Sequence, residues 1–230
     1  MNQGDVISYL EMCQKEGCNL QRGMNFKLNN GLSVILMSLR ENAPYADRIE
    51  DNGKTLIYEG HDIPNYKDLK ISPKNMDQPK YTPTGKFTEN GKFYNAAMRF
   101  KKGEDKAEKV KVYEKIKNGI WVYNGIFELV DSWNEKSNDR SVFKFKLKLI
   151  DDISENYKQE TEIDHNRLIP SSVKIEVWKR DKGQCVICGS NKNLHFDHVL
   201  PFSKGGASLV SENIQLLCVK HNLQKSNKIQ

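Results

Sequence analysis

The chain has 230 residues, 37% of them apolar, and carries 36 Lys and Arg against 30 Asp and Glu, a formal net charge of +6. This length exceeds that of most single domains, so we expect two domains. No apolar run reaches the roughly 18 to 20 residues that a membrane span needs, and the N-terminus lacks the basic-then-apolar pattern of a signal peptide. We therefore expect a cytoplasmic protein without a membrane partner.

The positive charge gathers near the C-terminus. Residues 171–230 contain 9 Lys and Arg against 4 Asp and Glu, whereas the first 170 residues are almost neutral. Such an excess suits nucleic acid as a partner, because Lys and Arg release the counterions that condense on phosphates. A solvated surface is the alternative explanation of the same charge.

In chain order, the first predicted element is an amphipathic helix over residues 4–16. Its apolar stripe consists of Val6, Leu10 and Cys13, which stand at helical spacing. The five cysteines are an odd number, which argues against a disulfide framework. Cys13 and Cys18 are therefore predicted to be buried thiols.

Four segments rich in β-branched and aromatic residues predict strands of a twisted sheet or barrel. They are residues 32–39, 54–60, 119–133 and 141–150. Between the second and third lie a polar Pro- and Lys-rich loop over 62–88, a short helix over 94–100 and a charged segment over 101–111. A loop of this length in a compact domain commonly has a function.

A polar span without periodicity covers residues 151–172 and ends in Pro170-Ser171-Ser172. We place the linker at 156–172. It separates a domain over 1–155, which opens with a helical segment over 1–25, from a domain over 173–230.

The second domain contains two pairs of soft metal ligands. Cys185 and Cys188 form a tight knuckle, and Cys218 and His221 are expected three apart on one helix face, where they can complete a tetrahedral site. A module of about 60 residues has a small apolar core, so a metal clip would stabilise it. Buried thiols with a surface histidine are the alternative. We predict a structural zinc ion bound by these four residues.

Harder ligands stand between and beside the soft ones. Asp197 and His198 are adjacent, so on one strand they point to opposite faces unless a strand end redirects them. Pro201 and Gly205–Gly206 mark such an end. Asn222 follows a zinc ligand and can face back towards the strand. Oxygen atoms of Asp197 and Asn222 suit a hard cation, Mg²⁺ or Mn²⁺.

His198 titrates near neutrality and can take a proton from a water molecule aimed at phosphorus. Asn213 can orient this imidazole through a hydrogen bond or brace the loop that carries it. With Asp197 and Asn222, these residues form a candidate catalytic set for one-metal phosphodiester hydrolysis. For His198 taken alone, a structural role is the alternative.

Two further residues are candidate contacts to the DNA backbone. His195 lies two residues before Asp197 and so on the same strand face, where it can touch a phosphate or pack beside the zinc module. Lys225 is predicted to meet the DNA backbone, with a solvated helix position as the alternative.

Residues 185–225 resemble the zinc-stabilised, McrA-like kind of HNH endonuclease. The family pattern is C-x-x-C, D-H-x-x-P, G-G, N-[LI]-Q-x-L-C and C-[HN]-x-x-K, and this chain departs from it at His221 and Asn222, where other ligand types stand more often. The resemblance implies a ββα-metal module in a bacterial enzyme that leaves 5′-phosphate and 3′-hydroxyl ends.

A second set of motifs recurs over the first domain. It consists of 31–37, 45–49, 51–53, Leu56-Ile-Tyr-Glu-Gly-His61, Asp77-Gln78 and 123–133. In this order the motifs resemble the SRA family, a twisted β-barrel with flanking helices that flips a modified cytosine from duplex DNA into an aromatic pocket. A plain β-barrel with aromatic core positions is the alternative.

The SRA resemblance implies a base pocket. Tyr45 and Tyr58 match its two tyrosines, and Asp47 is the candidate base-reading carboxylate, although a strict alignment puts Arg48 there. Glu59 stands where many relatives have a small hydroxyl residue.

Together these features predict an α+β protein that is a type IV-like, modification-dependent restriction endonuclease. Its partner would be double-stranded DNA that contains 5-methylcytosine or a related base. One site cuts one strand, so a homodimer or sequential nicking is expected. The alternatives are an HNH endonuclease that recognises unmodified DNA and a non-catalytic DNA reader with a zinc-clipped clamp.

Overall fold

The computed structural model describes residues 1–29, 31–64, 70–150, 168–200 and 209–226. Within these residues, eight strands form one large sheet and two form a small one. The strands are β1 (Val6–Ser8), β2 (Met24–Asn25), β3 (Ser33–Met37), β4 (Arg48–Glu50), β5 (Thr55–Glu59), β6 (Glu108–Lys117), β7 (Ile120–Ser137), β8 (Arg140–Leu149), β9 (Leu194–His198) and β10 (Ile214–Cys218). The helices are α1 (Tyr9–Glu16), α2 (Glu89–Lys101), α3 (Ser171–Arg180) and α4 (Val219–Ser226), with 3₁₀ turns η1 (Asp51–Gly53), η2 (Pro73–Asn75) and η4 (Ser211–Asn213).

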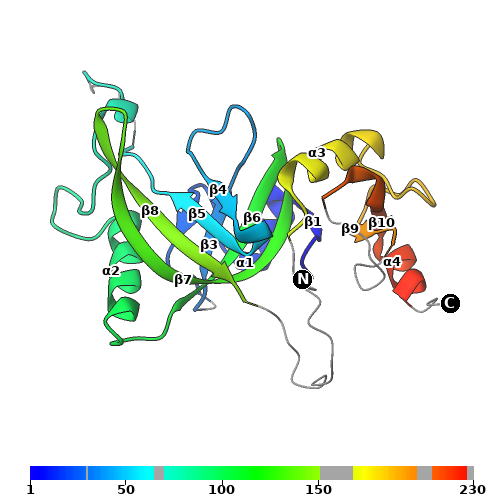
Figure 1. Ribbon diagram of the computed structural model, residues 1–230, viewed down its shortest axis with the longest axis horizontal. Coiled ribbons are helices and arrows are strands. Elements are labelled where there is room, and N and C mark those ends of the chain that lie inside the picture. The colour runs from blue at the N-terminus through cyan, green and yellow to red at the C-terminus, as the bar shows by residue number, and fades with distance from the viewer. Residues whose placement is uncertain (30, 65–69, 151–167, 201–208, 227–230) are drawn as a thin grey trace.

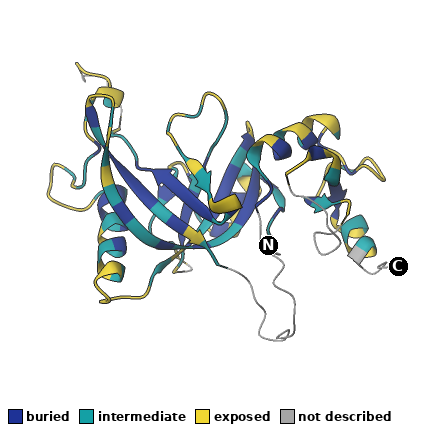
Figure 2. Ribbon diagram, in the orientation of Figure 1, coloured by how far each residue is buried: buried dark blue, intermediate teal, exposed yellow. Residues whose placement is uncertain are grey.

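The large sheet has the order β2-β3-β6-β7-β8-β5-β4, and β1 pairs with β7 outside this path. β3 and β6 run parallel, whereas the other described pairs are antiparallel. The strands β7 and β8 are long and bend together, and buried residues follow the strands of the sheet (Figures 1 and 2). This confirms a mixed α+β architecture. Among the described ladders, none joins β2 to β4, so these ladders show a curved sheet, and its closure into a barrel stays a prediction.

Four predicted strands are confirmed as β3, β5, β7 and β8. The central strand β6 was missed, because its sequence reads as a charged segment. Val110 and Val112 alternate with Lys and Glu along it, and both valines are buried in the core of the sheet. Strand pairing on both sides therefore outweighs the low β-propensity of Lys and Glu.

The N-terminal helix begins later than predicted. Residues Val6–Ser8 pair with β7, and Ser8 then caps α1 through a reciprocal pair of hydrogen bonds with Glu11. Leu10 is 73% exposed, so the predicted apolar stripe does not face the core. Cys13 and Cys18 are free thiols, as expected, but each is only partly buried.

The helix α2 starts at Glu89, earlier than predicted, because the Thr88 hydroxyl accepts a hydrogen bond from Gly91 N. The described parts of the long loop before it contain η2 and an isolated antiparallel bridge between Tyr81 and Phe87, but no strand or α-helix. Asp77 Oδ1 accepts a hydrogen bond from Ser141 N at 2.6 Å, and Gln78 Oε1 accepts one from Phe143 N at 2.8 Å. These bonds fix the loop to β8.

The C-terminal module has the element order ββα. β9 and β10 pair antiparallel, with His198 opposite Ile214, and α4 follows β10 directly. The apolar core of this module includes Phe196 and Leu216, and it continues into Val122 of β7. The module therefore packs against one end of the large sheet, while α2 lies at the other end (Figure 1).

The predicted division into a domain over 1–155, a linker over 156–172 and a domain over 173–230 stays a prediction. Residues 151–167 lie outside the described part of the chain. At the described end of the predicted linker, Leu168 and Ile169 are buried and α3 begins at Ser171. None of the described helices has the length and apolar character that crossing a membrane requires.

A close contact between Gly53 and Leu168 gives a first test. Gly53 has φ +98°, and a Cβ there would lie 2.9 Å from Leu168 N, whereas Gly85 has φ +78° and open space around it. We expect Gly85→Ala to lower the free energy of unfolding by about 1 to 2 kcal/mol, the cost of a left-handed backbone. Gly53→Ala should cost more, because the Leu168 backbone must also move. Urea unfolding measures both variants, and equal losses would contradict the close packing.

Candidate functional site

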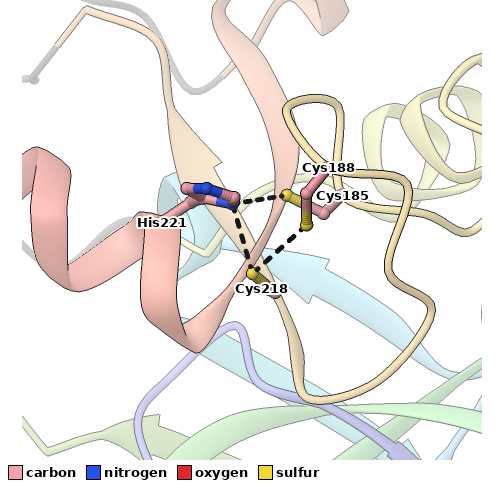
Figure 3. A group of neighbouring side chains, drawn as sticks. All are labelled: Cys185, Cys188, Cys218 and His221. Carbon is pink, nitrogen blue, oxygen red and sulfur yellow. Dashed lines mark hydrogen bonds between the residues drawn. The ribbon is translucent and has the colours of Figure 1, made fainter.

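Four soft ligands converge at the junction of β10 and α4 (Figure 3). The ligand atoms of Cys185, Cys188, Cys218 and His221 all lie within 4.8 Å of one another. Cys188 Sγ is 3.9 Å from Cys218 Sγ, and His221 Nδ1 is 3.3 Å from the sulfurs of Cys185 and Cys218. Tetrahedral zinc with Zn–S bonds of about 2.3 Å needs sulfurs roughly 3.8 Å apart. The cluster can hold a metal ion.

The backbone explains how these ligands meet. Cys218 is the last residue of β10 and His221 lies in α4. The prediction that both lie on one helix face is therefore wrong, and the strand-to-helix junction brings them together instead. In the knuckle, Gly189 N donates to Cys185 O at 2.8 Å with Gly189 at φ +71°. Burial raises the pKa of the Cys185 thiol, but hydrogen bonds from nearby backbone N–H groups lower it by more. The resulting pKa is about 6, which favours the thiolate.

The candidate catalytic residues Asp197 and His198 end β9. Lys225 reaches from α4 to Asp197 Oδ2 and to the His198 carbonyl oxygen, and Gln215 Nε2 lies 3.4 Å from the same carboxylate oxygen. Asn222 is half-buried and precedes Lys225 by three residues, so the two share one face of α4. The face of α4 that carries Asn222 is therefore turned towards Asp197.

Asn213 contacts the segment that follows His198. Its Oδ1 accepts a hydrogen bond from Leu200 N at 2.7 Å, and its Nδ2 donates to Leu200 O at 3.1 Å. Its carbonyl oxygen also accepts from Val199 N at 2.7 Å. Of the two roles that the sequence allowed for Asn213, these bonds fit the bracing of the segment that follows His198. Pro201 and Gly205–Gly206, the expected strand end, lie outside the described residues.

The electrostatics around His198 favour its neutral form. Burial lowers the pKa of the imidazole, Asp197 opposes this, and Lys225 and His195 add to the lowering. A neutral imidazole near pH 7 can accept a proton. His195 Nδ1 itself lies 3.0 Å from Asp5 Oδ1, a residue from the opposite end of the chain.

The two predicted pocket tyrosines meet at a second site. Tyr45, Tyr58 and His61 line one cavity of about 790 Å³. The Tyr45 and His61 rings stack with centroids 5.2 Å apart, and Tyr58 Oη is 2.9 Å from His61 Nε2. The Lys74 ammonium covers the Tyr45 ring at 3.9 Å from its centroid.

The predicted carboxyl residues of this pocket lie elsewhere. Asp47 lines a different cavity, and its carboxylate accepts hydrogen bonds from Glu59 N at 3.0 Å and Ser38 N at 3.2 Å. Glu59 is buried and forms ion pairs with Lys144 at 2.8 Å and Arg140 at 3.3 Å. Burial raises the pKa of Asp47 to about 7. Neither carboxyl group lines the tyrosine cavity, and both are bound by other groups of the protein.

Sequence reasoning missed the cations and the imidazole of the tyrosine cavity. Arg22, Arg40 and Lys115 line it, and no Asp or Glu is among its described lining residues. Burial lowers the pKa of Lys115, and the charge of Arg40 lowers it further. Uncompensated like charges favour an anion. His61 belongs to the motif over 56–61, so the sequence could have indicated it. The three cations come from separate segments, and sequence spacing alone cannot predict that they lie close together.

Comparisons with known proteins match the C-terminal residues and the larger part of the chain separately. The family model "HNH endonuclease" matches residues 185–228. The C-terminal part of this chain carries an HNH endonuclease domain. No curated protein matches the chain. The predicted HNH resemblance is thus confirmed for the segment that contains the cluster of candidate metal ligands and the candidate catalytic residues.

Solved structures similar to this chain include the SRA domain of SUVH5 in complex with methylated CHH DNA, at 23% identity and a TM-score of 0.45, covering 66% of this chain and 90% of that one. The modification-dependent restriction endonuclease TagI matches at 19% identity and a TM-score of 0.42, covering 98% and 78%. SUVH6 of Arabidopsis thaliana matches at 21% identity and a TM-score of 0.41, covering 76% and 28%.

The cysteine cluster of the HNH domain can be tested by metal content. Cys218→Ser should lose the bound metal ion and unfold the HNH domain at a lower temperature, because ion binding to a small metal module is coupled to its folding. Cys13→Ser is the control, since Cys13 is a free thiol outside the cluster. Elemental analysis and thermal circular dichroism provide the readouts. Equal metal content in both variants would exclude the cluster as the binding site.

Proposed function

We propose that this chain is a type IV-like, modification-dependent restriction endonuclease that reads 5-methylcytosine or a related base in double-stranded DNA. The observation that carries the proposal is the presence, in one chain, of an HNH domain and a cation-lined cavity in which Tyr45, Tyr58 and His61 gather. The cavity offers aromatic faces for a base and positive charge for phosphates, which are the two requirements for holding an extruded nucleotide.

The chemistry of the HNH domain follows from its two ligand sets. The soft sulfur and imidazole donors of Cys185, Cys188, Cys218 and His221 suit structural zinc. The oxygen donors of Asp197 and Asn222 suit Mg²⁺ or Mn²⁺. When bound, such a cation would stabilise negative charge on the scissile phosphate and the leaving oxygen.

His198 would accept the proton of the attacking water, since burial lowers the pKa of its imidazole and so favours the neutral form. Asn213 would keep His198 in place by bracing Leu200. Lys225 and His195 are proposed DNA-backbone contacts. Lys225 already lies beside Asp197, so its ammonium could shift to a phosphate once a cation takes its place.

For base reading, we propose that the flipped cytosine stacks on Tyr45 and Tyr58, the surface that His61 and Lys74 cover in the free protein. Asp47 and Glu59 would shape the pocket from behind, since their carboxylates bind backbone N–H groups and buried cations. The curved sheet would be the SRA-like barrel that supports this pocket. Cutting both strands would require a homodimer or two nicking events, and the cytoplasm of a bacterium is the proposed location.

Cleavage of matched DNA duplexes tests the proposal. Duplexes that differ only in one cytosine, as cytosine, 5-methylcytosine or 5-hydroxymethylcytosine, should be cut with Mg²⁺ or Mn²⁺ only when modified, and EDTA should abolish cutting. His198→Ala should reduce the rate at least about 100-fold. Equal cutting of all three duplexes would instead support an HNH endonuclease of unmodified DNA. Selective binding without cutting would support a non-catalytic reader.

The pocket assignment has its own test by DNA binding. Tyr45→Ala should reduce the preference for modified DNA by about 1 to 3 kcal/mol, or roughly 5- to 150-fold, because it removes one stacking surface for the base. Tyr81→Ala is the matched control, since Tyr81 is exposed and stacks on Phe87 outside the cavity. Fluorescence anisotropy with modified and unmodified duplexes measures both. An unchanged preference in Tyr45→Ala would remove Tyr45 from the pocket.

A further inference from the structure

A buried ion pair joins α3, the helix that precedes the HNH domain and packs against it, to the large sheet. Lys174 lies on α3 and is only 2% exposed. Its Nζ donates to Glu114 Oε2 on β6 at 2.6 Å and to Asn124 Oδ1 on β7 at 2.8 Å, and Asn124 Nδ2 donates to Glu114 Oε2 at 3.0 Å. The three side chains thus form a closed network across the contact between the two parts of the chain.

Such a network orients more than it stabilises. Removing an ammonium and a carboxylate from water costs several kcal/mol each, and apolar side chains of similar volume often give equal stability. An apolar contact tolerates sliding, whereas Lys174 satisfies its partners in only one arrangement of α3 on β6 and β7. Lys174 also lines a cavity with Asp197 and His198, so this arrangement lies next to the candidate catalytic residues.

The N-terminal segment makes a second connection. Gly4 N donates to Tyr123 O at 2.9 Å, and Phe196 N donates to Gly4 O at 3.1 Å, so Gly4 bridges β7 and β9. The Asp5 carboxylate lies 3.0 Å from His195 Nδ1. A Cβ at Gly4 would lie 3.1 Å from the His195 ring, which shows how closely β9 packs on this segment. The strand that carries Asp197 and His198 is therefore hydrogen-bonded to the large sheet.

The residues before α3 make a third connection. Leu168 belongs to the core of the large sheet, whereas its neighbour Ile169 belongs to the core that the HNH domain shares with β6 and β7. In the shared core, Val122 of β7 packs with Val177 of α3 and with Phe196 and Leu216 of the HNH domain. Apolar packing therefore continues from the large sheet through α3 into the HNH domain.

We infer that Lys174 is a positioning residue that locks the HNH domain to the base-reading domain as one rigid body, so that cleavage falls at one set distance from the recognised base. This inference rests on the proposed function for its cleavage readout. The lock itself rests on the Glu114 and Asn124 contacts, the bridge through Gly4 and the shared core. If the two domains move as one rigid body, the cut positions should spread over no more than about two nucleotides, since each nucleotide advances roughly 3.4 Å along a strand.

The test removes both charges of the lock in the full-length protein. Lys174→Met with Glu114→Gln leaves no unpaired buried charge, so the double variant should fold. The matched control is Lys102→Met with Glu104→Gln, the same change at a pair whose side chains are 70% and 48% exposed. Cut positions are mapped on both strands of a duplex with one 5-methylcytosine, and ¹⁵N relaxation gives the rotational correlation time of each domain without DNA.

We expect one narrow cut distance and a single correlation time for the wild-type protein and the control. The double variant should spread its cuts over several more nucleotides, and its HNH domain should tumble faster than the large sheet. Two distinct correlation times in the wild-type protein, or an unchanged cut distribution in a folded double variant, would overturn the inference. If the double variant fails to fold, the correlation times and the cut distance of the wild-type protein still test whether the two domains form one rigid body. Cutting without regard to modification would refute the proposed function alone, because the relaxation result stands independently of it.

Discussion

The main-chain pairing of β7 is the constraint on which both candidate sites depend. This strand of 18 residues pairs with β6 over 120–129, with β1 over 120–122 and with β8 over 127–137. At one end it supplies Trp121 to the wall of the tyrosine cavity and Asn124 to the network around Lys174. Since one continuous strand carries both contacts, a change in its register would displace the tyrosine cavity and the HNH domain together.

Next to Tyr58, the buried charge of Glu59 is compensated by a series of ion pairs. Glu59 lies between Lys144 and Arg140, and Arg140 continues to Asp62, which also pairs with Lys74. This chain of alternating charges connects β5, β8 and the long loop before α2. The loop is thereby fixed to the sheet by polar contacts, although it has almost no regular structure of its own. The Lys74 ammonium over Tyr45 lies at the solvent-exposed end of the same chain of charges.

Local patterns in the sequence predicted the parts of the protein whose geometry is local. The C-x-x-C knuckle and the later Cys218 and His221 indicated a cluster of metal ligands, and β-branched and aromatic residues indicated β7 and β8. The strand β6 was missed because Lys and Glu flank its buried valines. Its place in the sheet comes from parallel pairing with β3, in which Val110 lies opposite Ser33, 77 residues earlier in the chain (110 − 33). Long-range pairing leaves no periodic signal in a single sequence.

The same limit applies to the sites. Tyr45 and Tyr58 could be matched by motif, but motif order cannot show that Asp47 turns away towards backbone N–H groups. The cations Arg22, Arg40 and Lys115 reach the cavity from three separate segments. Lys174 gave no signal, because a lysine on a helix ordinarily points to solvent. Only the three-dimensional arrangement shows that it is buried against Glu114.

The bridge through Gly4 also bears on how such a protein can exchange its parts. The HNH sheet has β10 on one side of β9 and residues 4–5 on the other, so its full set of strand contacts is discontinuous in sequence. A recombination event that joined a foreign recognition domain just before α3 would transfer β9, β10 and α4 without that neighbour. Successful shuffling would therefore need a donor whose own N-terminal segment presents a similar backbone edge, which restricts the domain combinations open to this architecture.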